Sequence, residues 1–187
     1  MPIVSAAQPR VSFTDLQHMP DDGRRFELYD GEVFELSGPI PVHQVVVDNI
    51  KRLLQRYSDG HGGLSFVSPI DIVFSEYNVV QPDVIFFTRG RRHLVDFYAA
   101  IRHAPDLVVE VLSPSTSTND RGRKMRMFAR FGVAEYWIAD PLAKSLEVYG
   151  FRDGAGRLVQ TACGDDLVQS PRLAGFEFPV HEAFRLP

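Results

Sequence analysis

Cysteine is almost absent from this sequence, and its scarcity excludes two kinds of protein. The 187 residues include one cysteine, Cys163. A single thiol cannot form an internal disulfide or build a cysteine-rich zinc site. The length is enough for one domain with a sizeable apolar core, and the 44% hydrophobic content is that of an ordinary globular protein.

Long hydrophobic runs are also lacking. No stretch approaches the roughly 20 apolar residues that span a bilayer. The start, Met1 to Gln8, has no basic region and too short an apolar stretch for a signal peptide. We therefore expect a cytoplasmic protein without membrane contact, built as one domain over residues 1–187 with a loose arm at 1–11.

Charge of one sign is only weakly in excess. The net charge of −4 argues against a broad surface that coats nucleic acid. It leaves room for a local basic cleft, because the field at a site depends on the charges nearby.

Hydrophobic periodicity predicts many strands and two main helices. Strands are expected at residues 25–29, 32–36, 64–74, 79–88, 106–112, 135–140, 145–151, 157–162 and 166–169. Helices are expected near residues 14–19, 42–57, 94–102 and 120–131, the last one capped by Asn119 or Asp120 and ended by Gly132. The mixed order predicts an α/β (α+β) fold, with the doubly apolar 106–112 strand at the centre of its sheet.

Three charged residues stand where the local pattern is apolar. Asp83 precedes the run Val84–Phe87, and Glu110 shares a strand face with Val108 and Leu112. Lys124 is in line with the apolar stripe that Met127, Phe128 and Phe131 make on the predicted helix. Buried charges are costly unless they are paired or bound to a metal. Two acids and a base therefore suggest a metal-dependent hydrolytic site.

Each of the three residues also has a structural interpretation. Asp83 can be a turn former at the start of its strand. Glu110 can belong to a buried ion pair, with Lys124 as one candidate partner. Lys124 can extend along the edge of the core towards water, or it can pair with Asp120 four residues earlier.

Together the three residues match a known chemistry. Carboxylates hold Mg²⁺ or Mn²⁺, which prefer oxygen ligands. Such a metal polarises a phosphate and lowers the pKa of a bound water. A nearby lysine orients the water or stabilises the charge that develops on phosphorus.

Several motifs resemble one protein family. These are Gln81-Pro82-Asp83-Val84, Glu110 to Ser115, Asp120 to Lys124, and Gly132 to Pro141. Their order and spacing resemble the Uma-type restriction endonuclease family of the PD-(D/E)xK nuclease superfamily, over about residues 26–149. The resemblance implies a restriction-endonuclease-like mixed β-sheet flanked by helices and a Mg²⁺-dependent phosphodiester site. Asp83 matches the first acid of the motif and Glu110 the second.

The chain departs from the superfamily motif at one position. The motif places its lysine two residues after the second acid, where this sequence has Leu112. The resemblance implies that Lys124, on the following helix, has taken over the role of that lysine. It also marks Glu27 as a further candidate metal ligand and His43 as a candidate contact to phosphate or the attacking water. An exposed strand glutamate and a histidine at the core edge are their structural alternatives.

Basic side chains near these motifs are candidate contacts to a nucleic-acid backbone. They are Arg89 and Arg91 in the segment after the Asp83 strand, and Arg121 and Arg123 beside Lys124. A solvated surface is the alternative.

The leading hypothesis is a Mg²⁺- or Mn²⁺-dependent DNA endonuclease. The first alternative is a non-catalytic interaction or nucleic-acid-binding domain that keeps the nuclease fold, and the second is a hydrolase of another phosphoester. Many nucleases of this superfamily act as dimers, so the resemblance also implies a homodimer.

Overall fold

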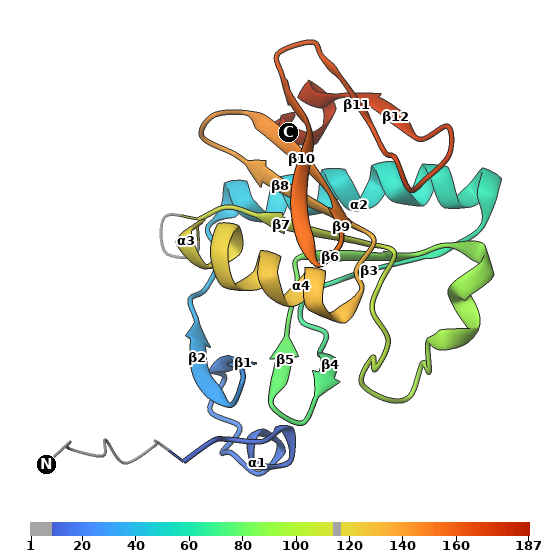
Figure 1. Ribbon diagram of the computed structural model, residues 1–187. Helices are drawn as coiled ribbons and strands as arrows, with labels where there is room; N and C mark the ends of the chain where they lie inside the picture. The colour runs from blue at the N-terminus through green and yellow to red at the C-terminus, as the bar shows by residue number, and fades with distance from the viewer. Residues whose placement is uncertain (1–8, 114–116) are drawn as a thin grey trace, which may run out of the picture.

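Two main β-sheets and a few helices make up residues 9–113 and 117–187, which the computed structural model describes (Figure 1). The strands are β1 (Arg25–Tyr29), β2 (Glu32–Leu36), β3 (Leu64–Val67), β4 (Ile72–Ser75), β5 (Asn78–Val80), β6 (Val84–Phe87), β7 (Leu107–Val111), β8 (Glu135–Asp140), β9 (Ser145–Arg152), β10 (Ala155–Cys163), β11 (Leu167–Gln169) and β12 (Glu177–Pro179). The helices are α1 (Phe13–Gln17), α2 (Pro41–His61), α3 (Ser117–Asn119) and α4 (Met125–Phe131), with a π-helical turn at Asp120–Lys124 and 3₁₀ turns at Arg89–Leu94 and Val180–Phe184.

The larger sheet is mixed, as the sequence predicts. Its order is β10-β9-β8-β7-β6-β3, and only the β7–β8 pair within it is parallel. The helical segment from α3 to α4 connects these two parallel strands. β7 has neighbours on both sides and every one of its residues is buried, which confirms its predicted central position.

Helices cover both faces of this sheet. The apolar face of α2, with Ile50 and Leu54, packs on side chains such as Val109 and Trp137. α4 covers the opposite face through Met127 and Phe128 (Figure 1). These two layers confirm the predicted sheet flanked by helices. The lysine side of the 120–131 segment faces the sheet, as the stripe on that helix predicts.

The smaller sheet, in the order β2-β1-β5-β4, begins with the predicted hairpin. Asp30 and Gly31 both have positive φ at its turn, a conformation that Asp-Gly provides at low cost. Residues 1–8 of the expected arm lie outside the described residues. Arg10 and Val11 are not loose, because they bond to the carbonyls of Asp30 and Gly31.

Two predicted strands were wrong in length. The chain over 64–74 forms β3 and β4, and that over 79–88 forms β5 and β6, so each run contributes one strand to each sheet. Pro69 and Pro82 stand at the two crossings, where a residue without an N–H interrupts a ladder. An apolar run in the sequence does not show that its first half pairs with strands of one sheet and its second half with strands of the other.

Two helix predictions also need correction. Residues 95–102 form no helix, because Ile101 bonds with Asp71 and Val73 and pairs with Ile72 as a parallel bridge. The helical segment predicted at 120–131 begins earlier, at Ser117. Asn119 therefore has helical backbone angles and does not cap it. The amide of Asn119 instead donates to the Tyr29 hydroxyl at 2.9 Å.

The C-terminal segment adds elements that the sequence did not predict. β12 pairs with β11, and the 3₁₀ turn at Val180–Phe184 packs against α2. A search of the described residues finds no helix long and apolar enough to cross a membrane.

Candidate active site

Asp83 lies where the chain passes from the smaller sheet to the larger one. It follows Pro82 and directly precedes β6. Its Oδ2 accepts the backbone N–H of Val111 at 2.7 Å and lies 3.2 Å from His43 Nε2. The first contact attaches Asp83 to the end of β7, and the second attaches it to the first turn of α2.

Glu110 projects from β7 at the same end of the sheet. Its side chain is on the face that α4 covers, and the residue is only 3% exposed. Its Oε1 accepts the Lys124 amine at 2.9 Å. The two predicted acids therefore come from adjacent strands and meet at one end of the sheet.

Lys124 ends the π-helical turn and has three carboxylate neighbours. Its Nζ lies 2.9 Å from Glu110 Oε1, 3.2 Å from Glu27 Oε1 and 3.6 Å from Asp120 Oδ1. The residue is 4% exposed, so its amine is not in bulk solvent. Both structural interpretations that name a partner, the Glu110 pair and the Asp120 pair, are present at the same time. A π-helical turn is often found at functional sites.

Glu27 enters the site from the smaller sheet. The expected alternative of an exposed strand glutamate is wrong, because Glu27 is fully buried. It accepts the Tyr29 hydroxyl at 2.6 Å and the Gln81 backbone N–H at 2.9 Å, besides the Lys124 contact. β1 and the helix carrying Lys124 are thus joined through a single carboxylate.

The charges in this cluster are unbalanced. Burial raises the pKa of Glu110 well above its usual value, and the nearby Asp83, Asp120 and Glu27 raise it further, against the opposing effect of Lys124. Burial disfavours the charged ammonium, but the carboxylates around it raise the pKa of Lys124 well above the ordinary value. One ammonium serves more acids than it can neutralise, so a further cation would stabilise the cluster.

A pocket of about 600 Å³ opens onto this cluster. Asp83, Glu110, Asp120 and Lys124 line it, together with His43. The remaining lining residues come from the β2–α2 link, the β3–β4 crossing and their neighbours: Arg25, Leu36, Ser37, Gly38, Pro39, Ile40, Gln44, Ser68, Pro69, Gln81, Val111 and Ser113. The charged groups can therefore be reached from solvent.

The donor set fits a hard divalent cation held mainly by its substrate and water. Among the described residues, no group of three or more His, Cys, Asp or Glu side chains is arranged as a closed metal cage. Mg²⁺ does not need one, since it commonly binds through one or two carboxylates plus waters and phosphate oxygens. Asp83 and Glu110, both lining the pocket, supply carboxylates of the right type.

The predicted basic contacts are not gathered at this pocket. Arg91 pairs with Asp106 at 3.2 Å, at the opposite end of β7, and Arg89 is exposed at the first position of the 3₁₀ turn that follows β6. Arg121 pairs with Glu147, and Arg123 pairs with Glu32 at 2.9 Å. None of the four lines the pocket.

Sequence patterns missed two members of the site. Asp120 was considered as a cap and as a helix partner of Lys124, and it is 1% exposed within the charged cluster. Arg25, at the start of β1, lines the pocket and donates to Ser68 Oγ at 3.2 Å. The i, i+4 spacing to Lys124 was an available signal for Asp120, whereas no local pattern marks Arg25.

Comparison with solved structures gives the class of fold. The chain is similar to a crystal structure described as "a putative nuclease belonging to DUF820" from Anabaena variabilis, with a TM-score of 0.76 and 17% identity. The match covers 93% of this chain and 97% of the other. The fold is therefore that of a nuclease-like mixed sheet.

The sequence comparison then gives the family. Residues 13–181 match Uma2, whose description is "Putative restriction endonuclease". This chain belongs to the Uma2 family. It is also 27% identical over 185 residues to an uncharacterized protein of Synechocystis sp., covering 97% of this chain and 95% of the relative.

Proposed function

We propose that this protein is a Mg²⁺- or Mn²⁺-dependent endonuclease that hydrolyses phosphodiester bonds in DNA. The observation that carries the proposal is the meeting of Asp83, Glu110 and Lys124 in one solvent-accessible pocket. Membership of a family described as restriction endonucleases supports it.

Asp83 and Glu110 would hold the metal ion. When bound, the metal supplies a Lewis acid for the scissile phosphate and lowers the pKa of a water molecule. The surplus of carboxylates over Lys124 favours a cation here. Burial is the main reason why the pKa of Glu110 is raised, and the neighbouring acids raise it further.

His43 acts on Asp83 in this proposal. Its Nε2 lies 3.2 Å from Asp83 Oδ2, and the Val111 N–H bonds to the same oxygen. Two contacts from different elements fix the direction of the carboxylate. His43 is therefore a positioning residue for the first acid and lies beside the space for substrate.

Lys124 has two tasks. Its ammonium neutralises part of the charge on Glu27, Glu110 and Asp120, so that the acids can stay together. On the pocket side it is a positive charge beside the place where phosphate would bind, and such a charge stabilises the transition state.

The non-catalytic alternative rests on a specific observation. The Lys124 amine is already surrounded by three carboxylates, an arrangement that also describes a purely structural ion-pair cluster. In that case the protein would bind nucleic acid through the same fold without cutting it.

Plasmid cleavage with Mg²⁺ or Mn²⁺ tests the proposal. The wild type is expected to nick or linearise supercoiled DNA, and Asp83→Ala should not. Cutting both strands in one encounter needs two sites, so a homodimer should give linear product directly. A wild type that binds DNA but never cuts it would favour the non-catalytic alternative, and cleavage confined to small phosphoesters would favour another hydrolase.

A further inference from the structure

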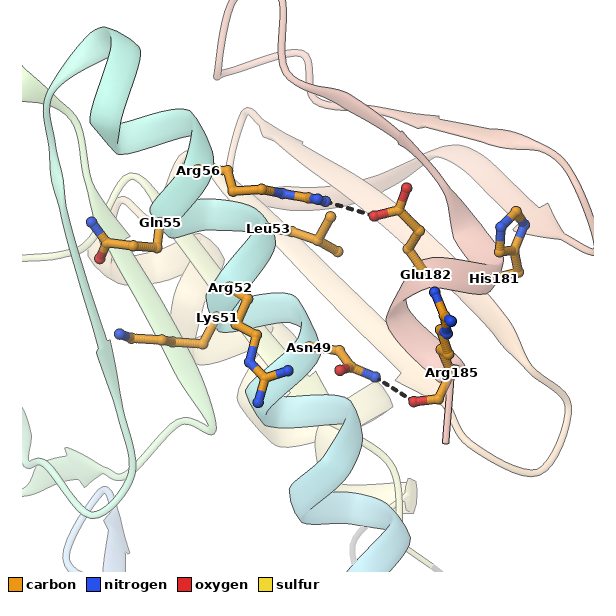
Figure 2. A pocket seen from close by; sticks show the side chains of 9 residues that line it. All are labelled: Asn49, Lys51, Arg52, Leu53, Gln55, Arg56, His181, Glu182 and Arg185. Atoms are coloured by element: carbon orange, nitrogen blue, oxygen red, sulfur yellow. Dashed lines mark hydrogen bonds and ion pairs between the residues drawn. The ribbon is translucent and has the colours of Figure 1, made fainter. Parts of the chain in front are cut away.

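A second hollow, of about 670 Å³, lies between α2 and the C-terminal 3₁₀ turn (Figure 2). It belongs to neither the acidic cluster nor the pocket above it. Its lining residues are Asn49, Lys51, Arg52, Leu53, Gln55, Arg56, His181, Glu182 and Arg185.

The lining of this hollow is strongly basic for a chain with a net charge of −4. Four of the nine lining residues are Lys or Arg, and only Glu182 is acidic. Arg52 is bonded to Asp48 on its own helix, and Arg56 to Glu182. Within the part of the chain that the structure describes, the side chains of Lys51 and Arg185 form no ion pair.

The two walls of the hollow are tied together. The Asn49 amide donates to the Arg185 carbonyl at 2.8 Å and to the Ala183 carbonyl at 3.2 Å. Arg56 bonds to Glu182 at 2.6 Å across the gap, as Figure 2 shows. The cations are therefore presented by a groove that is formed before any ligand arrives.

The hollow between α2 and the 3₁₀ turn, called the basic groove below, is connected to the candidate active site through shared lining residues. Gln44 lines both the pocket of the candidate active site and a middle hollow of about 570 Å³. Lys51 lines both that middle hollow and the basic groove. Gln44 and Lys51 are seven residues apart, two turns along one face of α2. Three hollows thus follow one another along this helix.

We propose that this series of hollows is a track for the phosphodiester backbone of DNA, in which Lys51, Arg52 and Arg185 hold phosphates outside the scissile bond. The inference rests on the proposed function, because it assigns the remainder of the same substrate to the basic groove. The length of the track is suitable. From His43 to Arg56 the helix rises about 20 Å, which equals the axial rise of about six base-pair steps of duplex DNA.

Contacts of this kind position the substrate without reading its sequence. They release counterions, so the affinity should depend steeply on salt. An acidic protein can bind a polyanion in this way, because the lining of the basic groove carries four Lys or Arg side chains and one acid.

The test is binding of a fluorescein-labelled DNA duplex in EDTA, measured by fluorescence anisotropy over a series of salt concentrations. Lys51→Ala/Arg185→Ala should bind several-fold more weakly than the wild type. The slope of log affinity against log salt should fall by about two, one for each lost contact. Arg152→Ala/Arg157→Ala is the matched control, since it removes two exposed cations from β9 and β10 beside α4. Circular dichroism and melting check that both variants fold.

An unchanged salt slope in the folded groove variant would overturn the proposal. An equal loss in the Arg152/Arg157 control would also overturn it, because binding would then depend on charge anywhere on the surface. A wild type that binds heparin or an acidic polypeptide but no DNA would do the same. Cleavage is measured separately. If binding depends on the groove but the wild type does not cut DNA, the proposed function alone is refuted. If the wild type cuts DNA but the groove variant binds DNA as tightly and with the same salt slope as the wild type, the track alone is refuted.

Discussion

The two ends of β7 carry buried carboxylates with opposite surroundings. Asp106, just before the strand, accepts the N–H and hydroxyl of Thr88 at 2.8 and 2.9 Å, and it pairs with Arg91 and Arg172. Glu110, near the other end, accepts a hydrogen bond from Lys124 and faces other acids.

The pKa directions express this difference. Burial raises the pKa of Asp106, but the bonds from Thr88, Arg172 and Arg91 outweigh it and hold the pKa below the usual value. Burial and like charges instead raise the pKa of Glu110. A carboxylate with a surplus of donors stabilises the fold, whereas one with a surplus of acids is suited to binding a cation.

The largest expected effect comes from removing an acid at the Glu110 end. Glu110→Gln and Asp83→Ala should each lose Mn²⁺ binding in isothermal titration calorimetry and all detectable cleavage. The thermal stability of Glu110→Gln should change little, because the substitution also removes like-charge repulsion. Mn²⁺ affinity equal to that of the wild type in both variants would show that the metal is not held here.

Lys124→Ala should have the next largest effect on the rate of DNA cleavage. Loss of one electrostatic group of this kind typically lowers the rate by about 10²–10³. Lys124→Arg should not restore the full rate, because a planar guanidinium does not replace a compact ammonium. Plasmid nicking gives the rate.

Lys124→Ala should also lower the free energy of unfolding. Removing the partner of buried carboxylates costs about 3–5 kcal/mol, so urea denaturation must accompany the assay. A well-folded Lys124→Ala protein with unchanged nicking would refute a catalytic role for the lysine.

Asp106→Asn makes the same carboxylate-to-amide change at the other end of the strand. It should lower the free energy of unfolding by about 2 kcal/mol, because charged donors lose their partner. The half-exposed arginines regain water, which limits the loss. Mn²⁺ affinity, measured in parallel, should equal that of the wild type. A drop in metal affinity would show that the two ends are not independent.

The smallest effect concerns pH. Because folding lowers the pKa of Asp106, its stabilisation is present above the unfolded pKa of about 3.9 and is lost as the pH falls through the folded value. The stability difference between wild type and Asp106→Asn should be constant near neutral pH and should shrink in acid. Urea denaturation at several pH values measures it, and a difference that grew as the pH fell would contradict this sign.

Sequence patterns predicted much of the fold and the burial of two charged residues of the candidate site. Periodicity located α2 and β7, and an apolar run interrupted by a charge identified Glu110. The inward side of Lys124 followed from the stripe with Met127 and Phe128. These features depend on neighbours within one element, so local spacing is enough to reveal them.

Other features could not be predicted in this way. The burial of Glu27 depends on where β1 lies against α3 and the π-helical turn, and nothing within β1 records that contact. Arg89 and Arg91 are near Asp83 in sequence, but β6 carries them to the opposite end of the sheet. Proximity along the chain is therefore misleading where a strand lies between two residues.

The sequence by itself determined that Glu110 and Lys124 would be buried although they are charged, because apolar neighbours at regular spacing leave few other positions for them. Only the tertiary structure decided which charges would meet. It brought four acids and one lysine together at one end of β7, and donors around Asp106 at the other. The reason is physical: the cost of burying a charge is set locally, but its compensation comes from groups that only folding brings within a few ångströms.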